Sequence, residues 1–422
     1  MKVLFLNTFE KTGGAAIACL RLMNALNANG VQTKLLVLDK QTDDANVYTV
    51  NTNCWKKLLN QWRFVWERLF IFVNSHIKRK DLFRVSIANT GTDISRHPLV
   101  QEADIIHLHW INCGFLSVKD IEKLTRLGKP IVWTMHDMWS CTGICHHSYT
   151  CLKFQTSCAE CPFLNSKKEK DLSQSVFMEK KQRLQLPTLH YVAVSNWLAD
   201  MAKRSSITSN HNITVIPNVI SLSQMTPLDR AEARVKLSVY ESYLIAFGAV
   251  RIDNEIKGFK YLAEAVRILT EEYHYQPEQI RLLLFGGIHN KEILDIISVP
   301  YSYYGFIADK TMLSTIYSAA NVVVSSSLYE TFGQTLIEAQ LCGSVPVSFD
   351  NSGQTDIILH KQNGYLAKYL SSTDLAVGID WGFHSNISAA ELRKYVKNTF
   401  GEVVVAQQYK DLYQKLIENN IK

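Results

Sequence analysis

The sequence lacks any stretch of about 18 uncharged apolar residues, the length that a membrane-spanning helix needs. Its first segment, Met1–Asn7, is typical of a buried strand, and the apolar core of a secretory leader does not follow it. We therefore expect a cytoplasmic protein. The net charge of +6 is also small for a chain of this size, so composition alone does not indicate nucleic acid as a partner.

The chain carries enough apolar material for two buried sheets. Hydrophobic residues make up 47% and charged residues 20% of its 422 positions, which excludes a disordered protein. A chain of this length exceeds what a single hydrophobic core usually supports, so two domains are expected. The order of a strand ending at Asn7, a helix over Ala15–Asn29 and a strand over Thr33–Leu38 predicts a parallel, doubly wound α/β sheet.

A pair of glutamates follows the apolar run Val322–Val324. The run predicts a buried strand that leads through a turn into a helix. Because seven residues separate Glu330 from Glu338, the first carboxylate lies before the helix, the second lies about two turns inside it, and both can face one crevice. Phe332 and Gly333 open the helix, and the missing side chain at Gly333 lets its N–H groups approach an anion or sugar hydroxyls. Taken alone, the pair is more typical of a solvated helix with two surface glutamates.

The segments after this helix extend the pattern. Gly343–Asp350 predicts a buried strand with a Pro-Val step, Gly353 lies in the turn that follows, and Asn363-Gly364 comes next. With the glutamate pair, this order resembles the nucleotide-sugar half of the retaining glycosyltransferases of family four. The resemblance implies a GT-B fold, in which two Rossmann-like, doubly wound parallel-sheet domains face each other across a cleft.

The resemblance covers almost the whole chain and implies its division into domains. Residues 1–217 would bind the acceptor, and residues 218–402 would bind the nucleotide sugar. Residues 403–422 would form a last helix that crosses back to the N-terminal domain, and residues 141–161 would form a cysteine-rich insert.

Two segments are expected to hold the diphosphate of the donor. Gly13 and Gly14 stand where a strand turns into a helix, which lets the backbone approach a phosphate; the similar loop of the family lies across the cleft from the donor diphosphate. Arg251 and Lys257 follow the first strand of the second domain, where two cations can neutralise a diphosphate leaving group. By position they resemble the cation pair of the family, although the loop between them is longer and more polar here. The alternative is that both are bases of an exposed loop.

Two predicted strands end in histidine. Ala103–Trp110 carries His107 and His109, and Pro130–Thr134 leads to His136. Crevices form at the carboxyl ends of parallel strands, although a lone histidine more often makes structural hydrogen bonds. In the glycosyltransferases that the chain resembles, a histidine at such a strand end lies near the transferred sugar. His109 is therefore the first candidate, His136 the second and His107 the third.

Five of the nine cysteines lie within 141–161. Thiols this close in a reducing cytosol more often mark zinc than disulfides. The segment resembles an insert of a capsule and colanic-acid-type branch of the family, which usually has an aromatic residue where this chain has Cys141. The expected ligands of a structural zinc are Cys145, Cys151, Cys158 and Cys161, with His146 or Cys141 as a substitute for one of them. The alternative is a set of reduced packing cysteines.

Residues 55–84 mix aromatic and aliphatic side chains with basic ones, and only Glu67 and Asp81 oppose the positive charge. An amphipathic basic segment of this kind suits the interface of an anionic membrane. Alternatively, the aromatic residues pack on the domain and the bases form its solvated face. The apolar positions are Trp55, Leu58, Leu59, Trp62, Trp66, Leu69, Phe70 and Phe72, and the basic ones are Lys56, Lys57, Arg63, Arg68, Lys78, Arg79, Lys80 and Arg84.

Together with the resemblance, these features predict a cytoplasmic enzyme that moves a sugar from a UDP- or GDP-sugar to a glycan or lipid-linked glycan in bacterial surface polysaccharide biosynthesis. If residues 55–84 contact the membrane, the enzyme would act at its inner face. Glu338 would bind the ribose, and Glu330 with the amides at Phe332 and Gly333 would hold the sugar. No Asp-x-Asp motif occurs, so no catalytic metal is expected. We expect retention by same-face transfer, in which a diphosphate oxygen takes the acceptor proton and His109 hydrogen-bonds the sugar.

Two other classes of protein share part of this pattern. A GT-B sugar-nucleotide epimerase would have the donor site but would bind no acceptor, so product analysis with and without acceptor separates it from a transferase. A zinc-stabilised binding scaffold without activity would need the cysteines but not the carboxylates and bases. Slow donor hydrolysis on a panel of sugar nucleotides distinguishes an enzyme from such a scaffold.

Overall fold

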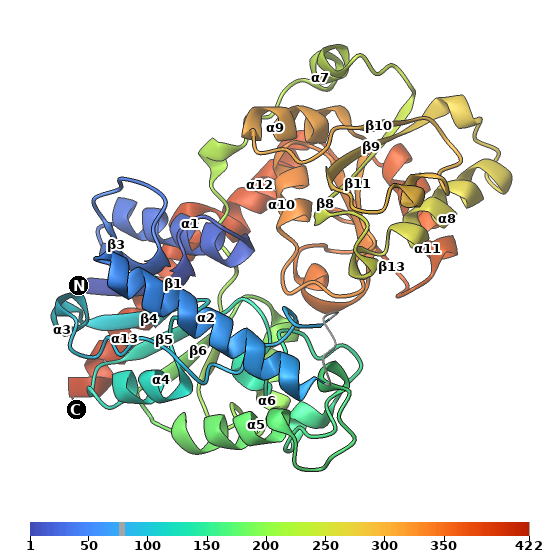
Figure 1. Ribbon diagram of the computed structural model, residues 1–422. Helices are drawn as coiled ribbons and strands as arrows, with labels where there is room; N and C mark the ends of the chain where they lie inside the picture. The colour runs from blue at the N-terminus through green and yellow to red at the C-terminus, as the bar shows by residue number, and fades with distance from the viewer. Residues whose placement is uncertain (76–80, 422) are drawn as a thin grey trace. The chain divides into compact units, whose positions relative to one another are not determined.

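The computed structural model describes residues 1–75 and 81–421. They form two compact units, one of Met1–Val219 with Glu402–Lys422 and one of Ile220–Gly401. The expected boundaries, after residues 217 and 402, lie within two residues of these. Helix α13 (Glu402–Ile421), red in Figure 1, belongs to the first unit although it follows the second in sequence.

The first unit is built on a parallel sheet with strand order β3-β2-β1-β4-β5-β6-β7. Its strands are β1 (Lys2–Phe9), β2 (Gln32–Asp39), β3 (Val47–Thr49), β4 (Ile105–Leu108), β5 (Ile131–Met135), β6 (Leu189–Ala193) and β7 (Ile213–Val215). Its helices are α1 (Gly14–Ala28), α2 (Cys54–Asn74), α3 (Pro98–Glu102), α4 (Val118–Thr125), α5 (Leu172–Arg183), α6 (Asn196–Arg204) and α13.

Helices α1 and α13 pack on the sheet of the first unit through one apolar core. Helix α1 buries Cys19, Leu22 and Leu26, which recur at the three- and four-residue spacing of one helix face. Helix α13 adds Tyr409 and Tyr413, and the Tyr413 hydroxyl lies 2.7 Å from His107 Nδ1 in β4. The returning helix is therefore part of the core of this unit.

The second unit repeats the plan with a parallel sheet of strand order β10-β9-β8-β11-β12-β13. Its strands are β8 (Tyr243–Arg251), β9 (Ile280–Gly287), β10 (Tyr301–Tyr303), β11 (Val322–Ser325), β12 (Val345–Phe349) and β13 (Tyr365–Ala367). Its helices are α7 (Arg230–Leu237), α8 (Phe259–Glu271), α9 (Lys310–Ala319), α10 (Gln334–Leu341), α11 (Ser372–His384) and α12 (Ala389–Phe400).

Two local features of the second unit differ from the sequence interpretation. Strand β8 continues to Arg251 through an irregular register after Gly248, so Arg251 ends the strand and does not lie in the loop. Helix α10 begins at Gln334, so Glu338 lies about one turn inside it and not two. Gly333 precedes the helix as its N-cap residue.

Each sheet has a switch point, the position where the strand order reverses direction. The order turns between β1 and β4 in the first unit and between β8 and β11 in the second. In open α/β sheets the loops after such neighbouring strands separate to opposite faces and leave a crevice, where ligands bind. The loop with Gly13 and Gly14, which we call the glycine loop, follows β1, and His109 follows β4. In the second unit Lys257 follows β8 and Glu330 follows β11. Topology therefore places the sequence candidates at the two positions where a site is expected.

Helix α2 lies on the outer surface of the first unit (Figure 1). Its carboxyl end joins a small second core through Ile71, which packs with Val85, Ile144, Cys145 and Cys161. The prediction that the aromatic residues pack on the domain is wrong for most of the helix. Its exposed apolar residues are Trp55, Leu58, Leu59, Trp62, Val65, Trp66, Leu69, Phe70 and Val73. Lys78, Arg79 and Lys80, which the basic pattern included, lie outside the described residues.

Among the helices of residues 1–75 and 81–421, none is both long enough and apolar enough to cross a membrane.

Candidate functional site

The carboxylate of Glu330 and the ammonium of Lys257 form an ion pair at the β8/β11 switch point. Ser327 Oγ donates to the same carboxylate oxygen at 3.0 Å. The two side chains come from loops that are joined by a backbone hydrogen bond of 2.8 Å from Leu328 N to Ile256 O. The sequence assigned the cation to a diphosphate and the carboxylate to a sugar, and the structure brings the two together.

The turn after β12 fixes the loop that carries Glu330. Ser352 Oγ accepts a hydrogen bond of 3.0 Å from Glu330 N, and Gly353 N donates to Glu330 O at 2.8 Å. A Cβ atom at Gly353 would lie 2.1 Å from the carbonyl oxygen of Thr331, so only glycine lets the two segments approach this closely. The glycine of the sequence pattern is thus needed for the position of Glu330.

Glu338 is buried in α10, with one carboxylate oxygen 3.9 Å from Lys310 Nζ. Phe332 is also buried, and its ring packs edge-to-face on Phe400. The side chain of Phe332 therefore belongs to the packing of this unit, and only its backbone is available to a ligand. Gly333 has φ of +104°, a backbone conformation that favours glycine.

Arg251 is separate from the Lys257–Glu330 pair in its contacts. Its guanidinium donates to both carboxylate oxygens of Asp253, at 3.2 and 3.0 Å, and its side chain is 45% exposed. Asp253 also accepts from the N–H groups of His289 and Asn290. The Arg251 hydrogen bond, and then these N–H groups, hold the pKa of Asp253 well below its ordinary value.

Three helix N-termini differ from the others in how they are capped. Helices α1, α8 and α10 begin after Gly13, Gly258 and Gly333, and within the described chain no side chain caps them. In α2–α7, α9, α11 and α12 a side chain accepts a hydrogen bond from a first-turn N–H. An uncapped N-terminus offers N–H groups and positive potential to an anion. The three glycine-started helices follow β1, β8 and the Glu330 loop, at the two switch points.

The glycine loop of the first unit is open. Gly13 has φ of +93°, and a Cβ atom at Gly13 or Gly14 would meet no atom within 4 Å. The backbone angle accounts for glycine at position 13, whereas within this unit no contact accounts for glycine at position 14.

His109 and His136 are joined by a hydrogen bond between their rings. The distance from His109 Nδ1 to His136 Nε2 is 2.9 Å, and the two rings stack. Burial lowers the pKa of His136 to about 4 and holds the pKa of His109 well below its ordinary value. Both rings are therefore neutral near pH 7. The third candidate, His107, is buried, and both of its ring nitrogens lie 2.7 Å from hydroxyls, those of Tyr413 and Thr134. We assign it to the core.

A small cavity of about 10 Å³ lies beside the histidine pair. Three buried polar atoms of its lining, His109 Nε2, Asn112 Nδ2 and Ser140 Oγ, have no hydrogen-bond partner among the described residues. A buried polar atom without a partner costs free energy, so such atoms are rare and cluster where a protein has a functional reason for them. Of the two ring nitrogens of His109, Nδ1 is bonded to His136 and Nε2 is left to bind a ligand.

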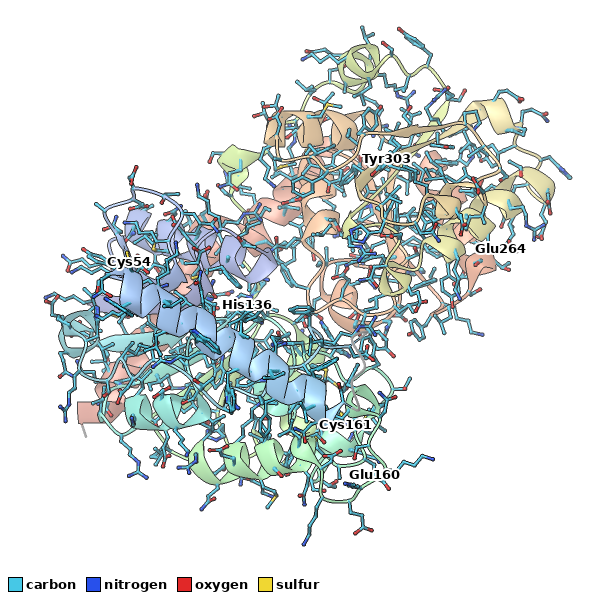
Figure 2. All side chains as sticks on the ribbon, viewed as in Figure 1. Cys54, His136, Glu160, Cys161, Glu264 and Tyr303 are labelled. Atoms are coloured by element: carbon cyan, nitrogen blue, oxygen red, sulfur yellow. The ribbon has the colours of Figure 1, made fainter. Side chains whose placement is uncertain are left out.

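Asp137 organises the loop next to His136, which Figure 2 labels. Its carboxylate contacts His146 Nδ1 at 2.6 Å and accepts from Trp110 Nε1 at 3.0 Å. Burial raises the pKa of Asp137, but His146, the Trp139 N–H group and His147 together outweigh that effect, and the pKa falls to about 2. His146 Nε2 lies 3.1 Å from Ser86 Oγ. His146, which the sequence offered as a substitute metal ligand, is instead engaged by Asp137 and Ser86.

Cys145, Cys151, Cys158 and Cys161 line one cavity of about 20 Å³. Cys161, labelled in Figure 2, follows three consecutive residues with positive φ, Cys158 at 55°, Ala159 at 109° and Glu160 at 42°. Burial raises the pKa of its thiol to about 11, and the backbone N–H groups of Phe163 and Leu164 oppose that rise. All four cysteines are free thiols. As the side chains lie, no three metal-ligating groups of the described residues are arranged to hold an ion.

Several of these site residues carry no signal in the sequence. Ser352 and Lys310 each reach a candidate glutamate from a separate turn or helix, and Ser327 does so from the loop of Glu330 itself. Asn112 and Ser140 join the His109 cavity from loops without a motif. Only Ser327 had a positional signal, because it precedes Glu330 by three residues in one loop.

Comparison with known proteins identifies the family of the chain. The family described as Glycosyltransferase Family 4 matches residues 12–224, half of the chain, and Glycosyl transferases group 1 matches residues 229–399. The chain belongs to glycosyltransferase family 4. A protein of Escherichia coli K12 named "Putative colanic acid biosynthesis glycosyl transferase WcaC" is 23% identical over 342 residues, which cover 76% of this chain and 77% of the relative.

Solved structures show that this family 4 glycosyltransferase has the GT-B fold. Sucrose-phosphate synthase from Thermosynechococcus elongatus matches with a TM-score of 0.64 at 18% identity, over 99% of this chain and all of the other. Anabaena Alr3699/HepE in complex with UDP and glucose matches with a TM-score of 0.60 at 18% identity, over 98% of this chain and all of the other.

Proposed function

We propose that this glycosyltransferase takes a sugar from a nucleotide sugar, a UDP- or GDP-sugar, and adds it with retention to a glycan or lipid-linked glycan of a bacterial surface polysaccharide, in the cytoplasm. The observation that carries the proposal is the Lys257–Glu330 pair between two uncapped helix ends, those of α8 and α10. A cation and helix N-termini suit a diphosphate, and carboxylates suit sugar hydroxyls. The name of the colanic acid relative and the UDP and glucose bound to HepE support the substrate classes.

In the proposed reaction the acceptor oxygen bonds to the anomeric carbon as the bond from that carbon to the diphosphate breaks. The electron pair of the broken bond stays on the diphosphate oxygen, which takes the acceptor proton from the same face. Lys257 and the open helix ends would stabilise the developing charge. If His136 Nε2 donates to His109 Nδ1, the proton of His109 lies on Nε2 and can be donated to a sugar hydroxyl.

The test begins with the purified chain and a panel of UDP-, GDP- and ADP-sugars. We expect one nucleotide class to raise the melting temperature, because a ligand that binds only the folded state stabilises it. With that donor, proton NMR of the product should show the anomeric configuration of the donor. Inverted configuration, or a glycosyl adduct trapped on a carboxylate, would refute same-face transfer. Absence of both binding and donor hydrolysis across the panel would refute the donor assignment.

We further propose that Cys145, Cys151, Cys158 and Cys161 hold a structural zinc. Their common cavity supports the proposal. The three left-handed residues that end at Glu160 cost roughly 1–3 kcal/mol each, and a bound metal would compensate this strain. The sulfurs have the right chemistry for zinc, and rotation of their side chains would have to bring them to one point.

Metal analysis of the purified chain should find about one equivalent of zinc. Cys158→Ser and Cys161→Ser should lose the metal and precipitate, whereas Cys54→Ser, at the start of α2 (Figure 2), should keep both metal and solubility. A metal-free chain that is fully folded would reject the zinc site and leave the glycosyltransferase assignment untouched.

A further inference from the structure

Helix α2 presents a continuous apolar stripe to solvent. At a rise of 1.5 Å per residue, the stripe is about 30 Å long. Single exposed apolar residues need no explanation, but a contiguous stripe marks an interaction surface. Its main members, between 49% and 80% exposed, are Trp55, Leu59, Trp62, Trp66, Leu69 and Val73. We call this set the α2 stripe.

The opposite side of α2 is held to the unit by polar contacts, which fixes the stripe outward. Glu67 is fully buried, and its carboxylate accepts from Ile87 N and Ala88 N at 2.8 and 2.9 Å. Arg68 pairs with Glu67 at 3.0 Å and donates to Val85 O. Turning the stripe inward would break the hydrogen bonds of Glu67 to Ile87 and Ala88 and that of Arg68 to Val85, and buried polar groups left without partners are unfavourable.

The accessible charge of α2 has one sign. Every residue of the helix is described, and its single acidic side chain, Glu67, is buried and paired. Lys56 and Lys57 are exposed and Arg63 is half-buried. Tryptophan and lysine together are the side chains that anchor a helix in the interface of an anionic bilayer.

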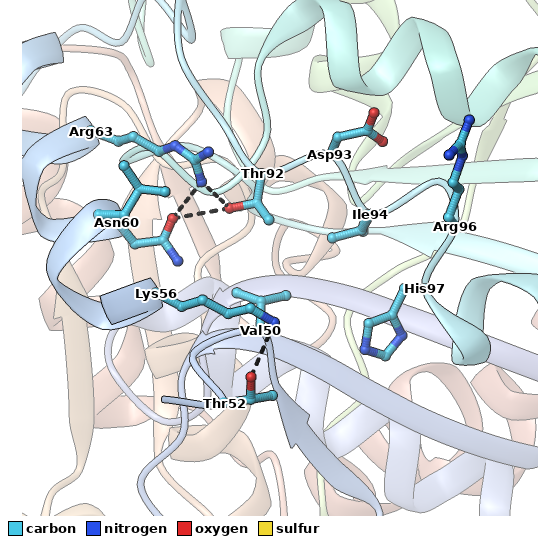
Figure 3. A pocket seen from close by; sticks show the side chains of 11 residues that line it. Val50, Thr52, Lys56, Asn60, Arg63, Thr92, Asp93, Ile94, Arg96 and His97 are labelled. Atoms are coloured by element: carbon cyan, nitrogen blue, oxygen red, sulfur yellow. Dashed lines mark hydrogen bonds between the residues drawn. The ribbon is translucent and has the colours of Figure 1, made fainter. Parts of the chain in front are cut away.

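A basic pocket of about 300 Å³ opens beside the amino end of the stripe. Arg63 lies on one side, where it donates to Asn60 and Thr92, and Arg96 and His97 lie on the other (Figure 3). Lys56 also lines it.

The pocket has a net positive charge. Its acidic member, Asp93, pairs with Lys123 at 2.7 Å, and that contact lowers the pKa of Asp93 to about 2. Burial, and then the Lys56 cation, lowers the pKa of His97, so its ring is neutral near pH 7. Three cations, those of Lys56, Arg63 and Arg96, therefore remain to attract an anion.

We infer that the α2 stripe lies in the surface of an anionic lipid bilayer and that the pocket of Lys56, Arg63 and Arg96 takes a lipid phosphate headgroup. The stripe supplies the apolar contact, and the pocket supplies charge complementarity at the same helix. Neither feature contributes to the donor site of the second unit, so this inference and the proposed function can fail independently.

Vesicle flotation of the full-length chain tests the inference without any sugar substrate. We expect the chain to float with vesicles that contain phosphatidylglycerol and to stay unbound with pure phosphatidylcholine. Added salt should weaken binding, because the headgroup attraction is screened. Trp62→Glu with Trp66→Glu should weaken partitioning by more than roughly a hundredfold. Phe306→Glu, an aromatic that is 71% exposed on the second unit, is the matched control and should bind as wild type.

The pocket is tested by a second variant on an exposed residue, so its folding is not at risk. Arg96→Glu should weaken binding roughly thirtyfold, the effect of two unit charges at the membrane surface. Lys394→Glu makes the same change in net charge on the second unit and should have no effect. Equal flotation with neutral and anionic vesicles, or wild-type binding by the Trp62 and Trp66 variant, would overturn the inference. So would a dimer in sedimentation that only this variant dissociates, or binding of inorganic phosphate without any binding of vesicles.

Discussion

The two switch points of this glycosyltransferase differ in the charge of the side chains that lie there. In the second unit the crevice holds the oppositely charged Lys257 and Glu330, both partly exposed. In the first unit the crevice holds two buried histidines, whose depressed pKa values keep them neutral. Charge in contact with water suits a diphosphate, whereas a neutral buried donor suits a sugar hydroxyl. The two sheets thus share one topology, but the charged side chains lie in the second unit and the neutral histidines in the first.

The largest effect should come from the carboxylates of the second unit. We expect Glu330→Ala and Glu338→Ala to lower transfer by at least roughly a thousandfold, since each removes a preorganised contact. Assays of turnover with the identified donor, alongside the melting temperature, provide the measurement. Glu264→Ala, at a half-exposed glutamate on α8 (Figure 2), is the control and should retain activity. Full activity in either folded variant would remove these glutamates from the site.

The histidine pair should have a smaller effect and a different signature. His109→Ala should lower turnover by roughly two to three powers of ten, the size of one lost transition-state hydrogen bond. Nucleotide affinity, measured by thermal shift, should stay unchanged, because the charged contacts belong to the second unit. His274→Asn, an exposed histidine that Asn can replace at its positive φ, serves as control. A large loss of nucleotide affinity in His109→Ala would contradict the assignment of nucleotide binding to the second unit alone.

Acid should destabilise the first unit before the second. The pKa of His136 is about 4 when folded and about 6.5 when unfolded. Between these values the unfolded state binds more protons, so stability falls as pH drops below about 6.5, by roughly 2 kcal/mol at pH 5 from this residue. The pKa of Asp253 is also lowered, but its contribution is lost only below its ordinary carboxyl range.

Urea unfolding at pH 7 and at pH 5 measures this difference. His136→Asn should reduce the loss of stability between the two pH values, since it removes the titrating ring. An identical pH dependence in wild type and variant would show that the buried histidine does not titrate as its environment indicates.

The smallest effect should come from Arg251. Its ion pair with Asp253 is half exposed, and such pairs contribute roughly 0–1 kcal/mol to stability. Asp253 keeps the N–H groups of His289 and Asn290 when the arginine is removed. We therefore expect Arg251→Ala to fold normally and to raise the KM for the donor by no more than about tenfold. An effect as large as that of Glu330→Ala would place Arg251 directly on the diphosphate.

Much of the fold was predictable because its determinants are local. Apolar runs such as Val322–Val324 alternate with helices, most of which begin after Ser, Asp, Asn or Gly, and this order specifies parallel strands joined by crossovers. Glu330, Gly353 and Asn363 form a recognisable pattern because they lie around one helix and the strand that follows it, α10 and β12, within a short part of the chain. The sequence by itself therefore determined the fold class and the strand ends that carry the site.

Only the tertiary structure decided which side chains meet. The pairing of Lys257 with Glu330 joins loops 73 positions apart, and that of His109 with His136 joins two strand ends. The outward direction of the α2 stripe depends on the hydrogen bonds that Glu67 accepts from the N–H groups of Ile87 and Ala88. These contacts depend on distances between segments that sequence periodicity does not encode, because periodicity reports which face of an element is buried but not what lies opposite that face.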